Sequence, residues 1–217
     1  MKTFIFGHTP QKTPIWGYRF HGAQEKVLIL GGVHGNEPEG VLACELLKER
    51  FFESYDLPYD LTLIPAFNPD GVLKGNRKNS NGVDLNRNLP TKDWTSQIAE
   101  EKYFPGVSAG SESENQALLA FIQAEKPQFI LSLHSFRESM LLDNNSLCRK
   151  ECESLARRTG LVIKNEIGYP TPGSLGTFGA FENNIPTLTY ELLRGMNFNE
   201  IREIHVPAIY EMLKERI

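Results

Sequence analysis

The sequence contains few cysteines, and this bears on the compartment in which the protein works. The three cysteines of the 217-residue chain are Cys44, Cys148 and Cys152, so any disulfide scheme would leave one thiol unpaired. A chain of this length can bury a core and does not need disulfides for stability. We therefore expect a reducing compartment.

Long apolar segments are also absent. No run of about 18 apolar residues occurs, which excludes a typical membrane-spanning helix. The first residues, MKTFIFGHTPQKTP, interrupt a short apolar stretch with Gly7, His8 and Pro10, so they do not form the apolar centre of a signal peptide. We expect a cytoplasmic protein, although a chain whose signal had been removed would look the same.

The chain has no large excess of charge of either sign. It contains 23 Lys and Arg residues against 27 Asp and Glu residues, which gives a formal net charge of -4. This balance provides no general attraction to nucleic acid or to an anionic membrane surface. We expect neither of them as a partner, and the charge does not indicate the oligomeric state.

Apolar segments typical of strands alternate with amphipathic segments typical of helices. The alternation predicts a single α/β domain over residues 1–217, with three layers (α/β/α) and a mixed, mostly parallel central sheet. Several strands are apolar throughout, which indicates that helices cover both faces of the sheet. The expected strands are residues 27–33, 61–67, 129–135, 139–143 and 187–193, and the expected helices are residues 38–53, 112–125, 148–159, about 177–183, and 199–216.

A histidine and a glutamate follow the first strong strand. In GGVHGNEPEG, residues 31–40, His34 lies on the expected loop and Glu37 at the start of the expected helix, which Asn36 is placed to cap. Open α/β sheets bind ligands at this carboxyl edge. On its own the spacing is a weak motif, because Glu37 could merely complement the helix dipole and His34 could be a polar loop residue.

Two further strands deliver polar side chains to the sheet. His134 ends the apolar strand FILSLH, and two histidines with one glutamate form a set that holds catalytic zinc and leaves a position for water. Glu191 lies in the apolar strand TLTYELL, where a buried carboxylate is costly unless it faces a polar site. Such a carboxylate can take a proton from attacking water and return it to a leaving nitrogen, unless Glu191 lies on the solvated face of an edge strand.

The long polar stretch between the second and third expected strands, residues 68–111, contributes cations. A polar excursion of this length is uncommon in a compact domain unless it is functional. Arg77 and Arg87, with Asn86 beside the latter, are donors suited to a carboxylate or to a developing oxyanion. Two solvated surface arginines are the alternative interpretation.

Taken together, these residues resemble the M14 family of zinc metallocarboxypeptidases. The resemblance rests on five segments in the family's order: HGNE (34–37), NPDG (68–71), NGVDLNRN (81–88), SLHSF (132–136) and YELL (190–193). Within the family the sequence is most similar to the bacterial murein peptide amidases. The segments that carry this closer likeness are RKNSNGVDLNRNLP (77–90), GSESENQAL (110–118) and GYPTPGSLGTFGA (168–180).

The resemblance implies a role for each candidate residue. His34, Glu37 and His134 match the ligands of one zinc ion, and Glu191 matches the general base. Arg77 matches the residue that polarises the scissile carbonyl, whereas Asn86 and Arg87 match the pair that holds the free carboxylate of a small peptide substrate.

The implied reaction is hydrolysis of the amide bond between γ-D-glutamate and meso-diaminopimelate in murein peptides, during cytoplasmic recycling of peptidoglycan. A diaminopimelate product carries an additional ammonium and carboxylate that the site must satisfy. The candidates for this task are Arg137, Glu138, Glu182 and Arg194.

The sequence also departs from the family pattern and leaves alternatives open. Phe136 stands where pancreatic-type carboxypeptidases have a tyrosine, and neither Tyr169 nor Phe178 aligns securely with the tyrosine that closes over their substrate. The alternatives are a carboxypeptidase acting on ordinary peptides, a deacylase of the succinylglutamate desuccinylase and aspartoacylase type, and a non-catalytic protein that binds wall peptides.

Overall fold

The computed structural model describes residues 1–216, and its centre is a mixed sheet of eight strands. The strands are β1 (Lys2–His8), β2 (Pro14–Phe20), β3 (Lys26–Gly31), β4 (Asp60–Ile64), β5 (Phe129–Phe136), β6 (Met140–Asp143), β7 (Val162–Lys164) and β8 (Thr187–Leu193). They lie in the order β1-β2-β4-β3-β5-β8-β6-β7. The central strands β4, β3, β5 and β8 are parallel, so their carboxyl ends meet at one edge.

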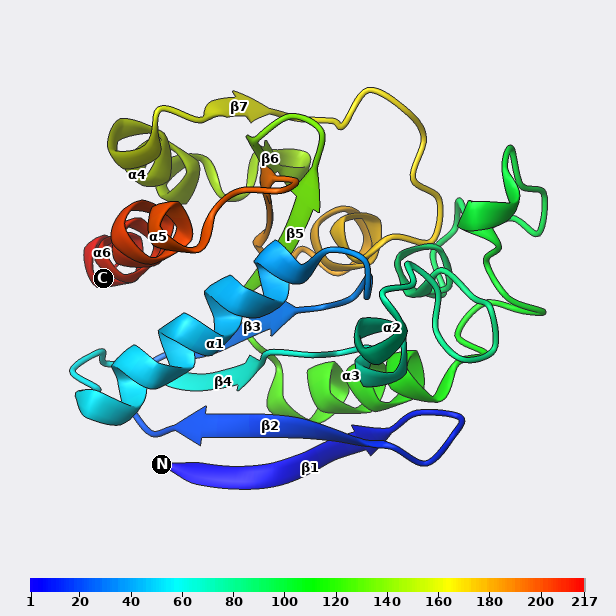
Figure 1. The fold of residues 1–217 in the computed structure, drawn as a ribbon, viewed down its shortest axis with the longest axis horizontal. Coiled ribbons are helices and arrows are strands. Elements are labelled where there is room, and N and C mark those ends of the chain that lie inside the picture. Colours follow the sequence, from blue (N-terminus) through cyan, green and yellow to red (C-terminus); the bar gives the residue numbers. More distant parts are fainter. Residues whose placement is uncertain (217) are drawn as a thin grey trace.

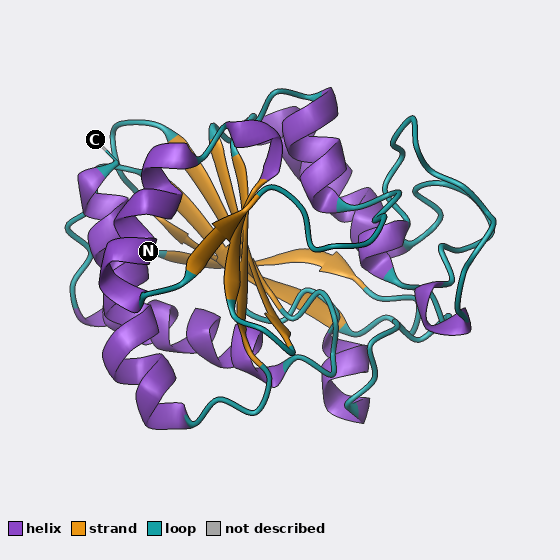
Figure 2. Ribbon diagram, turned by 90° about the horizontal axis from the view of Figure 1, so that it is seen from above, coloured by secondary structure: helices purple, strands orange, loops and turns teal. Residues whose placement is uncertain are grey.

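Helices cover both faces of this sheet (Figures 1 and 2). One face carries α1 (Pro38–Glu53), α4 (Arg149–Thr159), α5 (Phe198–Glu200), the π-helical turn η5 (Ile201–His205) and α6 (Val206–Glu215), and the other carries α3 (Ser113–Glu125). The shorter elements are α2 (Pro69–Lys74), η1 (Leu85–Arg87), η2 (Glu101–Tyr103), η3 (Asn144–Ser146) and the π-helical turn η4 (Thr177–Glu182). The predicted three-layer α/β/α architecture with a mixed sheet is confirmed. Among residues 1–216, none of the helices has the length and apolar character that crossing a membrane requires.

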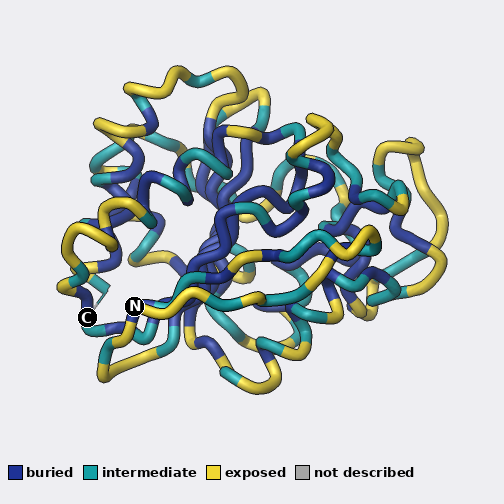
Figure 3. Tube along the Cα trace, turned by 60° about the horizontal axis from the view of Figure 1, so that its bottom comes forward, coloured by how far each residue is buried: buried dark blue, intermediate teal, exposed yellow. Residues whose placement is uncertain are grey.

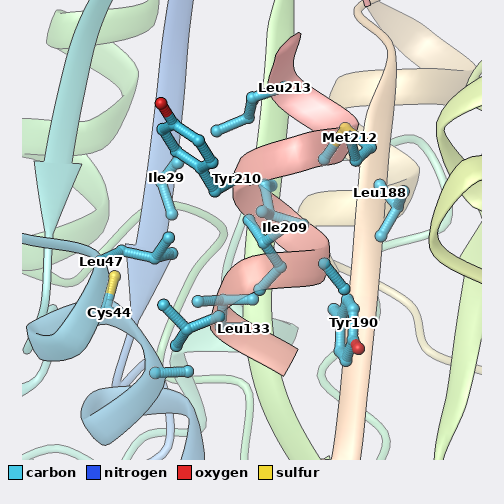
Figure 4. Close-up of a cluster of buried hydrophobic side chains, with 14 of the residues drawn as sticks. Ile29, Cys44, Leu47, Leu133, Leu188, Tyr190, Ile209, Tyr210, Met212 and Leu213 are labelled. Atoms are coloured by element: carbon cyan, nitrogen blue, oxygen red, sulfur yellow. The ribbon is translucent and has the colours of Figure 1, made fainter. Parts of the chain in front are cut away.

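The core consists of two apolar layers, one on each side of the sheet. In the larger layer, Ile209 and Leu213 of α6 pack with Leu47 of α1 against Leu133 of β5 and Leu188 of β8 (Figure 4). Each such side chain contributes roughly 1.5–3 kcal/mol when it is fully buried. The central strands β3, β4, β5 and β8 are buried over nearly their whole length (Figure 3), which explains why they are apolar without alternation.

The first two strands were not predicted, and the structure gives the reason. β1 is the edge strand, and none of its residues is buried. A bulge between Ile5 and Gly7 interrupts its pairing with β2. Because a bulge adds a residue to one strand, it breaks the alternation that identifies a strand in a sequence.

Other local predictions need correction. The expected strand 61–67 ends at Ile64, and the polar stretch that follows it contains α2, η1 and η2. Asn36 does not cap α1, because Glu37 is the N-cap residue and no side chain accepts a hydrogen bond there. The expected helix 199–216 is divided into α5, η5 and α6, with Pro207 in the first turn of α6.

The long loop between α2 and α3 is anchored by two buried carboxylates. Glu112 accepts hydrogen bonds from Asn79 and Asn81 at 2.8 and 2.9 Å, and Asn79 also contacts Glu114 at 3.3 Å. Burial raises the pKa of Glu114 to about 7, and the neighbouring Glu112 adds to the effect. The loop that carries Arg77, Asn86 and Arg87 is therefore attached to the start of α3.

This pKa predicts a pH-dependent cost in stability. The folded-state pKa lies above the ordinary value of 4.5, so the penalty is absent below pH 4.5 and complete above pH 7. We expect the unfolding free energy of Glu114→Gln, relative to the parent protein, to rise by about 3 kcal/mol across this window. Urea denaturation at several pH values would measure it. Glu203→Gln, at an exposed position, is the control, and a difference that does not vary with pH would contradict the prediction.

Candidate active site

Two strand ends bring the predicted metal ligands together. His34 follows β3 and Glu37 precedes α1, while His134 lies near the end of β5, the strand that pairs with β3 in parallel. All three side chains are buried, and one ligand atom from each lies within 4.8 Å of the others. The grouping is the one that the sequence predicted.

Two glycines allow the segments to approach this closely. A Cβ atom on Gly40, in the first turn of α1, would lie 2.4 Å from the carbonyl oxygen of Leu133 in β5. A Cβ atom on Gly35 would lie 1.9 Å from the carbonyl carbon of Gly71 in α2. No larger residue fits at either position. Because both are glycines, α1 can begin directly against β5, and Glu37 lies beside His134.

The imidazole rings are oriented by contacts at both nitrogens. Nδ1 of His34 lies 3.0 Å from Glu37 Oε1, and Nδ1 of His134 lies 2.9 Å from Glu37 Oε2. On the outer side, Nε2 of His34 lies 3.0 Å from Asp84 Oδ1, and Nε2 of His134 lies 2.9 Å from Ser132 Oγ. The outer contacts hold both Nδ1 atoms toward Glu37.

Asp84 links the histidine to the cationic loop. It is fully buried, and it accepts hydrogen bonds from Arg77 Nε at 2.9 Å and from the backbone N–H of Asn86 at 3.0 Å. Burial alone would raise the pKa of Asp84, but His34 and Arg77 outweigh burial and hold it below its usual range. One carboxylate therefore orients a predicted metal ligand, a predicted catalytic cation and the turn that carries Asn86.

Replacement of Asp84 by asparagine tests this orienting role. We expect zinc affinity to fall about 10- to 100-fold, because the carboxylate behind a metal-ligating histidine fixes the ring and raises its basicity. Competition with a chromophoric chelator would measure the affinity. Asp56→Asn makes the same chemical change at an exposed position outside the site, and equal affinities for the two variants would count against the role.

Glu191 lies next to His134 on the neighbouring strand. The two residues are register partners in the parallel pair β5 and β8, so their side chains point to the same face of the sheet. Glu191 is only 6% exposed. Burial raises the pKa of its carboxyl to about 7, although the neighbouring His134 opposes the rise. The alternative of a solvated glutamate on an edge strand is wrong.

Arg87 is a buried cation at the cavity wall. It is 4% exposed, and its Nη1 donates to the carbonyl oxygen of Asn86 at 2.6 Å. Its guanidinium lies 5.1 Å from the ring centre of Tyr103 and 5.9 Å from that of Tyr169. Within residues 1–216, no carboxylate lies within ion-pair distance of Arg87. Arg87 acts on Asp84 at longer range, but Asp84 is paired with Arg77, so the buried guanidinium of Arg87 favours binding of an anion.

All of the predicted site residues line one inner cavity of about 420 Å³. A larger outer cavity of about 900 Å³ adjoins it and shares several wall residues with it. The predicted residues in the inner cavity are His34, Glu37, Arg77, Asn86, Arg87, His134 and Glu191, and the residues shared by both cavities are Arg87, Lys102, Tyr103, Phe136, Tyr169, Pro170 and Arg194.

Not every candidate residue reaches the cavities. Glu138 forms a surface ion pair with Lys164, and Glu182 accepts a hydrogen bond from the backbone of Lys92. Phe178 packs against the apolar core, whereas Tyr169 lines both cavities. Of the two residues considered for closure over the substrate, only Tyr169 lies where it can contact one.

Sequence reasoning assigned no role to Asp84 or Ser132. Asp84 belongs to the NGVDLNRN segment, and a signal was available, because an acidic residue next to apolar Val83 and Leu85 is expected to be paired. Ser132 lies two residues before His134 and therefore on the same face of β5. No feature of the sequence identifies it as the partner of the imidazole.

Known proteins resemble this chain over most of its length. The zinc carboxypeptidase family matches residues 1–174. Murein peptide amidase A of Escherichia coli K12 is 31% identical over 211 residues, which cover 92% of this chain and 84% of the relative. Murein peptide amidase A of Vibrio campbellii is 32% identical over 178 residues, covering 76% and 68%. The crystal structure of a murein-tripeptide amidase from E. coli O157 has a TM-score of 0.80 and 26% identity, covering 99% of this chain and 92% of that one.

Proposed function

This chain belongs to the zinc carboxypeptidase family, and we propose that it hydrolyses the amide bond between γ-D-glutamate and meso-diaminopimelate in murein peptides. The family and the relatives identify it as a hydrolase, a zinc-dependent peptidase or amidase. The observation that carries the proposal is that every side chain predicted for catalysis lines one cavity. The three relatives described above are named for murein peptides, and they support the choice of substrate.

We assign one zinc ion to His34, Glu37 and His134. Two imidazoles and a carboxylate are the ligand types of open catalytic zinc sites. Nδ1 of His34 is buried without a hydrogen-bond partner among residues 1–216, although Glu37 Oε1 is 3.0 Å away, so this nitrogen is available to a metal. Bound there, zinc would act as a Lewis acid that activates water and polarises the scissile carbonyl.

Glu191 is the proposed general base and acid. Its carboxylate takes a proton from the attacking water and then delivers that proton to the leaving amine nitrogen. Its place beside His134, on the same face of the sheet, supports this assignment. Burial keeps the carboxylate away from bulk water, which would otherwise compete for the proton.

Arg77 is the proposed donor to the scissile carbonyl oxygen. Negative charge develops on this oxygen as water attacks, and a fixed guanidinium stabilises it without reorganisation. Asp84 holds Arg77 by two contacts of 2.9 Å, to Nε and Nη2, and this supports the assignment because the guanidinium is fixed before substrate binds.

Asn86 and Arg87 are the proposed clamp for the free carboxylate of the leaving residue. The buried Arg87 without a carboxylate partner supports this role, because a substrate carboxylate would complete its ion pair. Tyr169, whose ring lies 5.9 Å from the Arg87 guanidinium, is the aromatic residue that we expect to cover the bound substrate.

The rest of the inner cavity suits a charged side chain. Its walls combine the apolar Leu142, Ile167 and Phe181 with six polar residues, which are Asn144, Asn165, Glu166, Ser174, Thr177 and Thr189. The side chain of diaminopimelate ends in an ammonium and a carboxylate, which require hydrogen-bonding partners. A carboxypeptidase selecting large apolar side chains would have apolar walls here, so this lining favours the amidase over that alternative.

Mass-spectrometric digestion of L-Ala-γ-D-Glu-meso-diaminopimelate by the zinc-loaded protein tests the function. We expect release of free diaminopimelate, with no release after chelation or in Glu191→Gln. A panel of α-linked peptides and N-acyl amino acids would be digested in parallel. If the tripeptide stays intact while another panel member is cleaved, the substrate assignment is wrong but the assignment as a hydrolase stands.

A further inference from the structure

Arg194 lies where the inner and outer cavities meet. It directly follows β8, lines both cavities, and its side chain is 47% exposed. Its backbone N–H donates to the carbonyl oxygen of Phe136 at 2.8 Å, which fixes its position beside the end of β5. A substrate that extends from the inner into the outer cavity therefore passes this guanidinium.

The guanidinium also lies next to the metal ligands. Its Nη2 is 3.3 Å from Glu37 Oε1 and 3.3 Å from the carbonyl oxygen of Ser135. Among residues 1–216, Glu37 is the carboxylate within ion-pair distance of Arg194, and the same carboxylate contacts both ligand histidines. Because a metal ion would engage Glu37, the charge of Arg194 remains available to an anion of the substrate.

The proposed substrate carries such an anion on the acyl side of the scissile bond. A glutamyl residue linked through its γ-carboxyl keeps a free α-carboxylate, whereas the acyl residue of an α-linked peptide has none on its main chain. Three C–C bonds separate the α-carbon from the scissile carbonyl carbon, so the carboxylate lies roughly 5 Å from that carbon. Its partner must therefore be a cation close to the metal ligands.

The other cations of the two cavities are less suitable. Arg77 is bound to Asp84, and Arg87 serves the carboxylate of the leaving residue in the proposed mechanism. Lys102 pairs with Glu100 at 2.9 Å. Arg137 is 79% exposed and lines only the outer cavity. Arg194 is the remaining cation that combines contact with a metal ligand and access from the outer cavity.

We propose that Arg194 binds the free α-carboxylate of the acyl residue and thereby selects γ-linked D-glutamyl peptides over α-linked ones. The proposal rests on the proposed function and extends it to the acyl side of the substrate. The guanidinium offers paired N–H donors that match a carboxylate, a geometry that lysine does not reproduce.

A pair of peptides that differ in one group tests the proposal. The first is L-Ala-γ-D-Glu-meso-diaminopimelate, and in the second D-isoglutamine replaces the D-glutamate, so that the α-carboxylate becomes a carboxamide. We expect the parent enzyme to prefer the carboxylate by roughly 10- to 100-fold in kcat/KM, the range for a hydrogen bond to a charged group. Arg194→Gln should cleave both peptides at similar rates, and Arg194→Lys should recover part of the preference.

Arg137→Gln is the matched control, because it removes a neighbouring cation of the outer cavity. We expect it to retain the preference of the parent enzyme. Binding of the product L-Ala-D-Glu, measured by calorimetry, should weaken in Arg194→Gln by a similar factor, whereas binding of L-Ala-D-isoglutamine should not change. Zinc content and thermal unfolding would verify that each variant is folded and loaded.

The outcomes separate this proposal from the proposed function. If the parent enzyme cleaves both peptides equally, or if Arg194→Gln keeps the preference, the role of Arg194 is wrong although the amidase assignment stands. Loss of the preference in Arg137→Gln instead would move the role to that residue. If the parent enzyme cleaves neither peptide, the proposed function fails and the role of Arg194 fails with it.

Discussion

Glu191→Gln is expected to lower kcat by about 10²- to 10⁴-fold, the range that a positioned general acid and base contributes. Glutamine keeps the size and polarity of the side chain but cannot accept the proton of the attacking water. The Michaelis constant should change little, because the proposed substrate contacts come from other residues, among them Asn86, Arg87 and Arg194. Steady-state kinetics on the murein tripeptide would measure both parameters.

The zinc affinity of the Glu191→Gln variant distinguishes a catalytic effect of the substitution from a structural one. Glu191 is not among the ligand atoms that converge, so the glutamine variant should bind zinc with the affinity of the parent protein. Glu211→Gln, on the outer helix α6, is a control for the substitution itself. A variant that retains zinc and also retains full activity would refute the role of Glu191.

Removal of the metal should abolish hydrolysis and lower the thermal stability of the protein. Without a cation, the buried carboxylate of Glu37 and Nδ1 of His34 would lack the ion that we propose they bind. Zinc at about 1,000 times its dissociation constant stabilises the folded state by about 4 kcal/mol, or roughly 8–16 °C in melting temperature for a chain of this size. Activity assays and calorimetry after chelation and re-addition of zinc would measure both effects.

His134→Ala distinguishes a specific metal effect from a general effect of chelator or salt. This variant lacks one of the three proposed ligands, so zinc should no longer raise its melting temperature, and activity should stay at background. A zinc-dependent rise in this variant equal to that of the parent protein would place the metal elsewhere.

Much of the fold was predictable because its central strands are apolar and its main helices are regular. Residues 38–53 and 187–193 were predicted with the bounds of α1 and β8. The misses follow from weak local signals. β1 lies at the edge of the sheet with no buried residue, and α2 spans only six residues within a polar stretch.

The convergence of His34, Glu37 and His134, the proposed metal ligands, was predictable because each lies at a strand end or beside one, where the sequence marks its place. The partners of those ligands were not, since they depend on contacts between distant segments. Asp84 meets His34 across 50 positions of sequence, and Arg194 meets Glu37 across 157. The cap assigned to Asn36 failed because the first turn of α1 packs against β5 at Gly40. This packing sets where the helix begins.

The site is divided between two kinds of scaffold. His134 and Glu191 lie on adjacent strands of the central sheet, whereas Arg77 and Tyr169 lie on loops and Asn86 lies in the short turn η1. Loops accept insertions and substitutions more readily than buried strands do. Evolution can therefore alter which peptides this scaffold accepts through the outer loop around Tyr169, and an engineer seeking a new substrate should vary that loop and keep Arg77, the strands and the segment from His34 to Glu37 intact.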